Sequence, residues 1–320
     1  MHLRLIAFLA FVLVQTAPRV RAETAIVLNS VDESVSFVDT RTYQEYGRAP
    51  VCKEPHHLMA MPDDSAVIVA CAVSNELVFL DPRTGTEQKR IKNISDPYQI
   101  GFSPDKAWFV ANSLRLDRVD LYRAADFSLI ARIPAEKTPS HMAFDKASQF
   151  VFITLQDSNE ILAIDLKSRQ TAWRHPVGPT PAGIHMTPDD RYLLVGIMGA
   201  DYVEVIDWRA RRTVKRITTA RGAHNFLPRG DGRHVFVSNR TVNGSISLLD
   251  MQNLSVVENY DVPGGPDDME IREDGKELWA TARFARKVQV VNLEQKKLSH
   301  SIRVGRSPHG VSFISHAPRQ

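Results

Sequence analysis

Side chains that can bind metals, exchange protons or hold anions follow prolines that recur in this sequence at a fixed interval. These prolines are 42 residues apart and stand at Pro55, Pro97, Pro139 and Pro181, and again at Pro266 and Pro308. The two positions after each proline hold His56-His57, Tyr98-Gln99, Ser140-His141, Ala182-Gly183, Asp267-Asp268 and His309-Gly310, with Gly222-Ala223-His224 in a segment that lacks the proline. Imidazoles can coordinate a metal ion or change protonation near neutral pH, and a carboxylate can orient them.

Arginines follow a second recurring feature, the β-rich run that comes after each turn. Arg115, Arg240 and Arg283 lie in the loops after such runs. A guanidinium group binds carboxylate or phosphate through two parallel hydrogen bonds. The sequence therefore predicts a ligand site made of His56, His57, His141, His224, Arg240, Asp267, Asp268, Arg283 and His309. In the alternative interpretation these are solvent-exposed polar residues, and the arginines pair with the aspartates.

Each repeat reads as four short strands. In the first full repeat, a polar turn at residues 61–64 is followed by the apolar runs Val67 to Cys71 and Glu76 to Asp81. A third run closes the unit, as in Thr213 to Ile217. Together with the strand that the proline begins, about 40 residues supply four strands, which is typical of a β-propeller blade.

The number of repeats predicts how the ring closes. Full repeats begin near Pro55, Pro97, Pro139, Pro181, Arg221 and Pro266, whereas a seventh has only the strand Pro308 to Phe313. The runs at 25–29, 34–39 and 42–48 match the three missing strands. We therefore predict an all-β, seven-bladed propeller of four-stranded blades, a single domain over residues 23–320. Pairing of the N-terminal strands with the C-terminal strand would hide both sheet edges.

This architecture divides the loops between two faces. Recurring aspartates at the ends of the third strands would cap the turns that follow, because their side chains accept hydrogen bonds from backbone N–H groups. These residues are Asp39, Asp81, Asp165, Asp207 and Asp250, and Arg123 replaces the aspartate in the second repeat. The opposite face carries the varied residues after the prolines, so the innermost strands would place the candidate ligand site at the mouth of the central channel.

The N-terminus reads as a signal peptide over residues 1–22. His2 and Arg4 precede the apolar run Leu5 to Val14, which is too short to span a bilayer. We expect export to a bacterial periplasm and no transmembrane span in the mature chain. The whole chain has 40 Lys and Arg against 37 Asp and Glu, and residues 1–22 hold three arginines and no acid. The mature chain is therefore near neutral and lacks the basic footprint of a nucleic-acid-binding protein.

Cys52 and Cys71 are the two cysteines. Cys52 precedes the first full repeat and Cys71 ends its second strand, so antiparallel pairing brings both to the same rim. In an oxidising compartment these positions favour a disulfide, over free thiols or a metal site with His56 and His57.

The segments Phe109 to Asn112, Phe236 to Asn239 and Ile26 to Asn29 resemble the tetrapeptide that names the YVTN seven-bladed propellers, a group that includes YncE-like periplasmic proteins. The resemblance implies the fold over nearly the whole mature chain, and a propeller carries its function in loops and rim residues. No linear catalytic signature is present. The leading interpretation is a non-catalytic propeller that binds a small ligand or a periplasmic partner protein.

Two alternatives use the same residues. YVTN propellers are similar to the haem d1 domains of nitrite reductases and to accessory proteins of quinone-dependent oxidation, which implies a tetrapyrrole or redox association. His56, His57, His141 and His309 would then be candidate axial ligands, although d1 domains have eight blades. The second alternative is a metal-dependent lyase or lactonase with a divalent cation in the channel.

Overall fold

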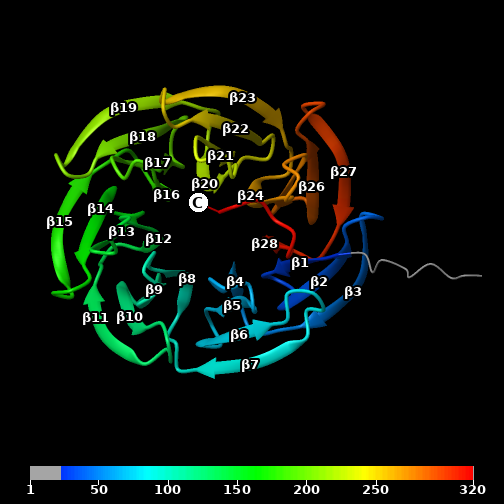
Figure 1. The fold of residues 1–320 in the computed structure, drawn as a ribbon, viewed down its shortest axis with the longest axis horizontal. Coiled ribbons are helices and arrows are strands. Elements are labelled where there is room, and N and C mark those ends of the chain that lie inside the picture. Colours follow the sequence, from blue (N-terminus) through cyan, green and yellow to red (C-terminus); the bar gives the residue numbers. More distant parts are fainter. Residues whose placement is uncertain (1–22, 320) are drawn as a thin grey trace, which may run out of the picture.

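The computed structural model describes residues 23–319, so the predicted signal peptide at residues 1–22 lies outside the described part of the chain. Seven four-stranded antiparallel sheets surround a central axis and form a closed ring (Figure 1). The predicted all-β, seven-bladed propeller is confirmed. No described helix has the length and hydrophobicity that crossing a membrane requires.

Blades 1 to 6 each consist of four consecutive strands, named from the channel outward. Blade 1 consists of β4 (Pro55–Ala60), β5 (Val67–Cys71), β6 (Glu76–Leu80) and β7 (Glu87–Lys92). Blade 2 consists of β8 (Pro97–Phe102), β9 (Trp108–Ser113), β10 (Arg118–Arg123) and β11 (Leu129–Pro134). Blade 3 consists of β12 (Pro139–Phe144), β13 (Phe150–Leu155), β14 (Glu160–Asp165) and β15 (Gln170–Pro176). Blade 4 consists of β16 (Pro181–Met186), β17 (Tyr192–Ile197), β18 (Tyr202–Asp207) and β19 (Arg212–Thr218). Blade 5 consists of β20 (Ala223–Pro228), β21 (His234–Asn239), β22 (Ser245–Asp250) and β23 (Ser255–Asp261). Blade 6 consists of β24 (Pro266–Ile271), β25 (Glu277–Ala282), β26 (Lys287–Asn292) and β27 (Lys297–Arg303).

Blade 7 joins the two ends of the described chain. Its strands in spatial order are β28 (Pro308–Ser312), β1 (Thr24–Asn29), β2 (Ser34–Asp39) and β3 (Gln44–Pro50). β1 pairs with β28 in antiparallel register, with Val27 opposite Val311. The predicted closure is confirmed: β28 is the innermost strand of blade 7, and β1 is paired on both sides, with β28 and with β2.

The hydrophobic core consists of seven clusters, one at each boundary between neighbouring blades. Phe79 of blade 1 and Phe109 of blade 2, for example, are both fully buried in one cluster. Burying such a side chain stabilises the fold by roughly 1.5–3 kcal/mol. A blade therefore buries its apolar faces only against its neighbours, which is why a ring of repeats is stable where one blade is not.

The predicted aspartate caps are confirmed. Asp81 Oδ1 accepts hydrogen bonds from the backbone N–H groups of Arg83 and Thr84 at 2.9 and 2.8 Å. The same kind of bond forms at Asp39, Asp165, Asp207 and Asp250. In blade 2, Arg123 has no carboxylate, and its turn keeps the backbone bond from Phe127 N to Arg123 O, which the aspartate turns at Asp39, Asp81 and Asp165 also have.

One predicted boundary differs in the structure. The fifth repeat was placed near Arg221, but β20 begins at Ala223. Ala223 lies opposite Asn239 as Pro181 lies opposite Ile197 in blade 4. Alanine therefore takes the place of the periodic proline, and His224 and Asn225 occupy the two positions that follow it.

The C-terminal segment runs from β28 to the middle of the ring in Figure 1. His316 bridges to Arg272, and Ala317 donates a backbone hydrogen bond to Ile271 O at 3.0 Å. Arg319 pairs with buried Glu270 in β24 and lies 3.8 Å from Asp64, in the turn between β4 and β5. These contacts place the segment at the turn face of the channel, opposite the candidate site.

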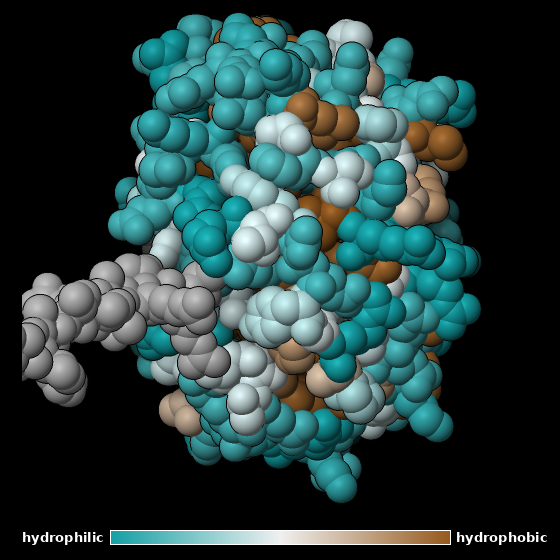
Figure 2. Space-filling model, turned by 90° about the vertical axis from the view of Figure 1, so that its right-hand side faces the viewer, coloured by the Kyte–Doolittle hydropathy of each residue, from teal (hydrophilic) through white to brown (hydrophobic). Residues whose placement is uncertain are grey.

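The outer surface is mainly polar. Figure 2 shows the side that contains β27 and β3, where hydrophobic groups form small separate patches among hydrophilic ones. The fourth strands carry most of this polar surface, as in β27, whose exposed residues include Lys297 and Arg303. Charged side chains on such an edge strand oppose pairing with other chains.

Candidate functional site

Asp267 is the centre of a charged cluster at the channel mouth. Its side chain has no exposed surface, and its carboxylate lies 3.1 Å from Arg240 and 3.2 Å from Arg283. His224 Nδ1 approaches Oδ1 to 3.1 Å, and His309 Nε2 approaches Oδ2 to 3.2 Å. Four of the predicted site residues, from blades 5, 6 and 7, therefore converge on the carboxylate of a fifth, Asp267.

Local structure explains how these residues meet. Asp267, His224 and His309 all occupy the first position after the proline or its alanine substitute, on the innermost strands. A β-bulge follows this position in most blades, including those of β20 and β24, and the strand register shifts there. Bulges re-aim side chains at strand ends. Arg240 and Arg283 reach the same point from the loops after the second strands.

Burial and charge act in opposite directions on Asp267. Burial would raise its pKa, but His309, His224 and Arg240 lower the pKa well below its ordinary value. Two guanidinium groups face this one carboxylate, so the cluster has an excess of positive charge. The neighbouring Asp268 does not cancel it, because burial raises the pKa of Asp268 to about 8 and keeps that carboxyl protonated at neutral pH.

The two arginines retain hydrogen-bonding capacity. Arg240 directs its second terminal nitrogen to the sulfur of Met198 at 3.0 Å, and a thioether is a weak acceptor. Arg283 donates from Nε to Ser307 Oγ at 3.1 Å, and its second terminal nitrogen has no partner in residues 23–319. Both side chains are partly exposed. The cluster can therefore accept a further anionic group.

His56 continues the ring from blade 1. Its Nδ1 lies 2.9 Å from Tyr98 O, and His309 Nδ1 lies 2.5 Å from His56 O. A carbonyl oxygen can only accept, so Nδ1 of His56 carries the hydrogen. Burial, helped by His309 and Arg283, lowers the pKa of His56 well below its ordinary value. His56 is thus a neutral imidazole whose Nε2 has a lone pair and no hydrogen-bond partner within the described chain.

Aromatic contacts connect the remaining members. The His56 ring stacks on Tyr98 at 3.7 Å between centroids and meets His309 at 4.1 Å. The centroid of the Tyr98 ring lies 6.5 Å from that of His141, and the His141 centroid lies 5.1 Å from that of His224. Because Ala182 and Gly183 provide no bulk in blade 4, blades 3 and 5 touch directly, and the contacts run around the whole mouth.

His141 and His224 differ from His56 in their hydrogen bonds. His141 Nδ1 lies 2.6 Å from Ser140 Oγ. His224 Nδ1 is close to Asp267 but poorly aligned for a hydrogen bond, and its buried Nε2 has no partner among the described residues. Burial lowers the pKa of His224 to about 4 and that of His141 well below its ordinary value, so both imidazoles are neutral at pH 7.

The second position after the proline has a different task. His57 Nδ1, Gln99 Oε1 and Asp268 Oδ2 accept hydrogen bonds from the backbone N–H groups of Ile100, Met142 and Val311. Each bond spans 43 residues and joins one blade to the next. Three different residue types thus satisfy the same donor, which gives His57 and Asp268 a role in holding neighbouring blades together.

Arg115 does not join the cluster. Its guanidinium pairs with Asp96 at 2.7 Å and with Glu54 at 2.6 Å, on the blade 1 and blade 2 side of the mouth. Tyr98 and Asn225 contact the cluster but were not selected from the sequence, and Asn225 Nδ2 lies 3.3 Å from Asp267 Oδ1. The 42-residue spacing that selected His56 also marks Tyr98, so that signal was present.

A disulfide joins Cys52 and Cys71 in blade 1. Cys71 lies opposite Pro55 in the sheet, one residue before His56. The segment 53–54 is also held by hydrogen bonds from Ala72 N to Glu54 O and from Lys53 N to Ser74 Oγ. These bonds fix the entry of β4, and with it the direction of the His56 side chain.

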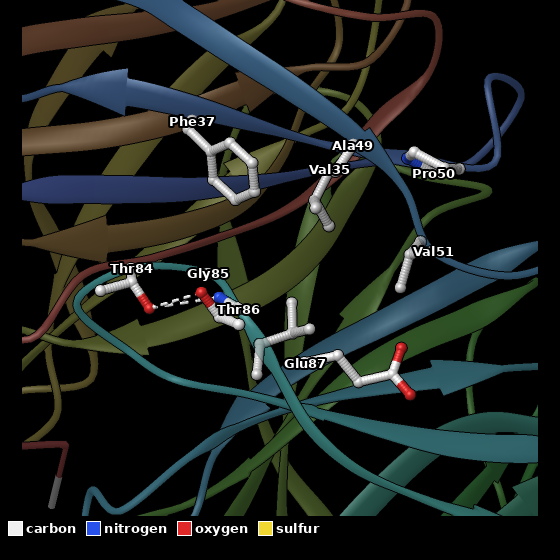
Figure 3. Close-up of a pocket in the computed structure, with 10 residues that line it drawn as sticks. Val35, Phe37, Ala49, Pro50, Val51, Thr84, Gly85, Thr86 and Glu87 are labelled. Atoms are coloured by element: carbon white, nitrogen blue, oxygen red, sulfur yellow. Dashed lines mark hydrogen bonds between the residues drawn. The ribbon is translucent and has the colours of Figure 1, made fainter.

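A groove outside the channel offers little chemistry. It has a volume of about 280 Å³ and lies between β2, β3 and the β6–β7 turn (Figure 3). Its lining is largely apolar, with Phe37 on one side and Thr84 bonded to Thr86 on the other. Across residues 23–319, no three His, Cys, Asp or Glu side chains form a group that could hold a metal ion.

Two curated relatives share recognisable sequence with the chain. Protein NirF of Pseudomonas aeruginosa is 22% identical over 308 residues, covering 88% of this chain and 78% of NirF. Dihydro-heme d1 dehydrogenase of the same organism is 21% identical over 297 residues, covering 87% of this chain and 59% of the dehydrogenase. The chain thus spans well under two thirds of that second relative.

Solved structures share the fold at lower identity. The structure of dihydro-heme d1 dehydrogenase NirN in complex with DHE has a TM-score of 0.59 and 19% identity, covering 90% of this chain and 66% of that one. A functionally unknown protein from Desulfotomaculum acetoxidans has a TM-score of 0.78 and 15% identity, covering 93% and 100%. The model of one family matches residues 4–319. With its seven blades and this match over nearly its whole length, the chain belongs to the YNCE-like beta-propeller family.

Proposed function

We propose that the chain binds a carboxylate-bearing tetrapyrrole of the haem d1 type at the channel mouth. Both curated relatives cover most of this chain, and the name of one states that it acts on a dihydro-haem d1. A solved relative is described in complex with DHE. These names support one chemical class for the small ligand that we propose to bind at the His, Asp and Arg residues of the mouth.

The state of His56 is the observation that carries this proposal. Histidines that ligate metals usually donate their other ring N–H to a carbonyl or carboxylate, which fixes the tautomer. His56 has this arrangement through Tyr98 O, and its neutral Nε2 has no other partner in the described chain. His56 would therefore hold the iron of such a tetrapyrrole through Nε2, and the iron would supply the redox chemistry when bound.

The arginines supply the second half of the fit. Tetrapyrroles carry peripheral carboxylates, and a guanidinium group binds a carboxylate with paired hydrogen bonds. Arg240 and Arg283 outnumber the buried Asp267 and keep donors that have no strong acceptor. In this proposal the protein holds and orients the ligand, and Asp267 keeps both guanidinium groups in place.

Absorption titration with iron protoporphyrin IX tests the ligation. The wild-type protein should shift the Soret band, and His56→Ala should abolish the shift. His185→Ala is the matched control, because His185 is a half-buried histidine on β16 that packs on Phe226 away from the cluster. Equal Soret shifts in wild type and His56→Ala would exclude His56 as the ligand.

Metal-free protoporphyrin IX separates ligation from carboxylate binding. His56→Ala should bind this probe with unchanged affinity, since no metal bond is lost. Arg283→Gln should weaken both probes by about tenfold, the effect of roughly 1.4 kcal/mol expected for a charge-assisted hydrogen bond. If neither probe binds the wild-type protein, the tetrapyrrole proposal fails.

We also propose that the protein functions after export, in a bacterial periplasm. The Cys52–Cys71 disulfide fits an oxidising compartment, and the apolar run at residues 5–14 reads as a signal segment. Fractionation of the native cell should recover the protein with the periplasmic contents, shortened by about the length of a signal peptide. Recovery of full-length protein from the cytoplasm would contradict this.

A further inference from the structure

The outer wall of blade 4 carries an unusual concentration of arginine. Residues 208–216 contain five Lys or Arg residues and no Asp or Glu. They form the β18–β19 turn and the first part of β19, where the side chains are largely exposed. We define the arginine face as Arg191, Arg209, Arg211, Arg212, Lys215 and Arg216.

Aromatic rings lie against four of these guanidinium groups. Arg209 lies over Trp208 at 4.1 Å, Arg191 over Tyr192 at 4.8 Å and Arg216 over Tyr202 at 4.8 Å. Arg211 lies 5.9 Å from the ring of Trp173, which belongs to β15 of blade 3. These are all the arginine–aromatic stacks in residues 23–319. Stacking restricts the side chain while leaving the N–H edge free to bind.

Nearby carboxylates neutralise only part of this charge. Asp190 pairs with Arg209 at 2.6 Å, and Glu204 lies 3.5 Å from Arg216. Arg211, Arg212 and Lys215 have no carboxylate oxygen within 4 Å in the described chain. Since the mature sequence is near neutral as a whole, this face is a local positive region.

We propose that the arginine face is a docking surface for an acidic protein segment. Planar guanidinium groups held in advance match carboxylates in the bidentate mode and lose less conformational entropy on binding. β19 is the outermost strand of its sheet, which leaves the side chains of Arg212, Lys215 and Arg216 accessible to a partner. The surface is independent of the channel mouth.

Other anionic partners fit less well. A protein that lies on a membrane inserts apolar side chains, but Trp173 and Trp208 are buried beneath the arginines. A nucleic-acid-binding domain usually combines such a basic patch with a strongly basic overall charge, which the near-neutral mature chain lacks. Carboxylates on a polypeptide are therefore the chemistry that this surface selects.

Binding of a fluorescent poly-L-glutamate peptide to the whole mature protein tests the proposal. Arg211→Glu with Arg212→Glu should weaken binding at least about tenfold, and salt should weaken wild-type binding because exposed charges are screened. Lys92→Glu with Lys297→Glu is the matched control, since it reverses two exposed charges on the edge strands of blades 1 and 6. This control should bind like wild type.

Two further arms decide between general charge attraction and planar recognition. The double variant Arg211→Lys, Arg212→Lys keeps both charges but removes the planar guanidinium donors, so it should also lose affinity for poly-L-glutamate. Wild-type affinity in this variant, or equal losses in the Lys92 and Lys297 control, would overturn the proposal. Binding to phosphatidylglycerol vesicles without binding to poly-L-glutamate would overturn it in favour of a membrane.

Discussion

Tyr98 contacts His56 in two ways: its carbonyl oxygen accepts the Nδ1 hydrogen bond at 2.9 Å, and its ring stacks on the imidazole at 3.7 Å. The backbone contact fixes the tautomer and the ring contact fixes the plane. Tyr98→Leu should remove only the second contact. A stack of this kind contributes roughly 1 kcal/mol, so affinity for iron protoporphyrin IX should fall about fivefold. Tyr98→Phe should bind normally, and a similar loss there would implicate the hydroxyl group.

Asp267→Ala should be strongly destabilising. The substitution leaves Arg240 and Arg283 facing each other without the carboxylate between them, and removing one partner of a buried ion pair costs about 3–5 kcal/mol. Urea unfolding measures the change. Asp39→Ala, which removes a turn cap on the opposite face, should cost about 1 kcal/mol. Equal losses in the two variants would show that the cluster contributes no more than a turn.

The contribution of His185 and His224 to the free energy of unfolding should decrease as the pH falls from about 6.5 to 4. Burial lowers the pKa values of His185 and His224 to about 4, whereas in the unfolded chain both titrate near 6.5. Between these pH values the unfolded state binds protons that the folded state does not bind, so a lower pH favours unfolding. Urea unfolding across this range measures the slope. His185→Phe should reduce it, and an unchanged slope would exclude His185 as a contributor.

Asp268 has the opposite effect on stability. Its pKa is about 8 in the folded protein and near 3.9 in an unfolded chain, so between these values the folded state holds the extra proton. The contribution of Asp268 to stability therefore falls as the pH rises from about 4 to 8, in opposition to the histidine contribution below pH 6.5. Asp268→Asn removes this titration and keeps an acceptor for Val311 N, so the variant should gain stability relative to wild type at pH 8. A variant that is equally stable or less stable relative to wild type there would contradict it.

Removal of the disulfide should destabilise the protein by roughly 3 kcal/mol, because Cys52 and Cys71 are 19 residues apart and the bond restricts the unfolded chain. Thermal unfolding of the Cys52→Ser, Cys71→Ser double variant measures this. Peptide mass spectrometry of unreduced native protein should find the two cysteines linked. Two thiols that can be alkylated in that protein would exclude the bond.

The sequence predicts the ring almost completely, since a 42-residue period, short apolar runs and turn aspartates report directly on strands and turns. Position alone could not show which side chains meet. Arg115 and Arg283 follow equivalent strands, but Asp96 and Glu54 bind the first and Asp267 binds the second. Variation after the prolines suggested that the fold does not dictate those residues. His57 and Gln99 nevertheless make the same bond to the next blade, because both side chains place an acceptor at the same point between blades.

The C-terminal segment determines how molecules can reach the channel. Ala317 is buried against β24, and Arg319 spans Glu270 and Asp64 at the turn face. The C-terminal segment therefore covers part of the turn face. A ligand bound at His56, as proposed above, would reach the channel mouth from the opposite face.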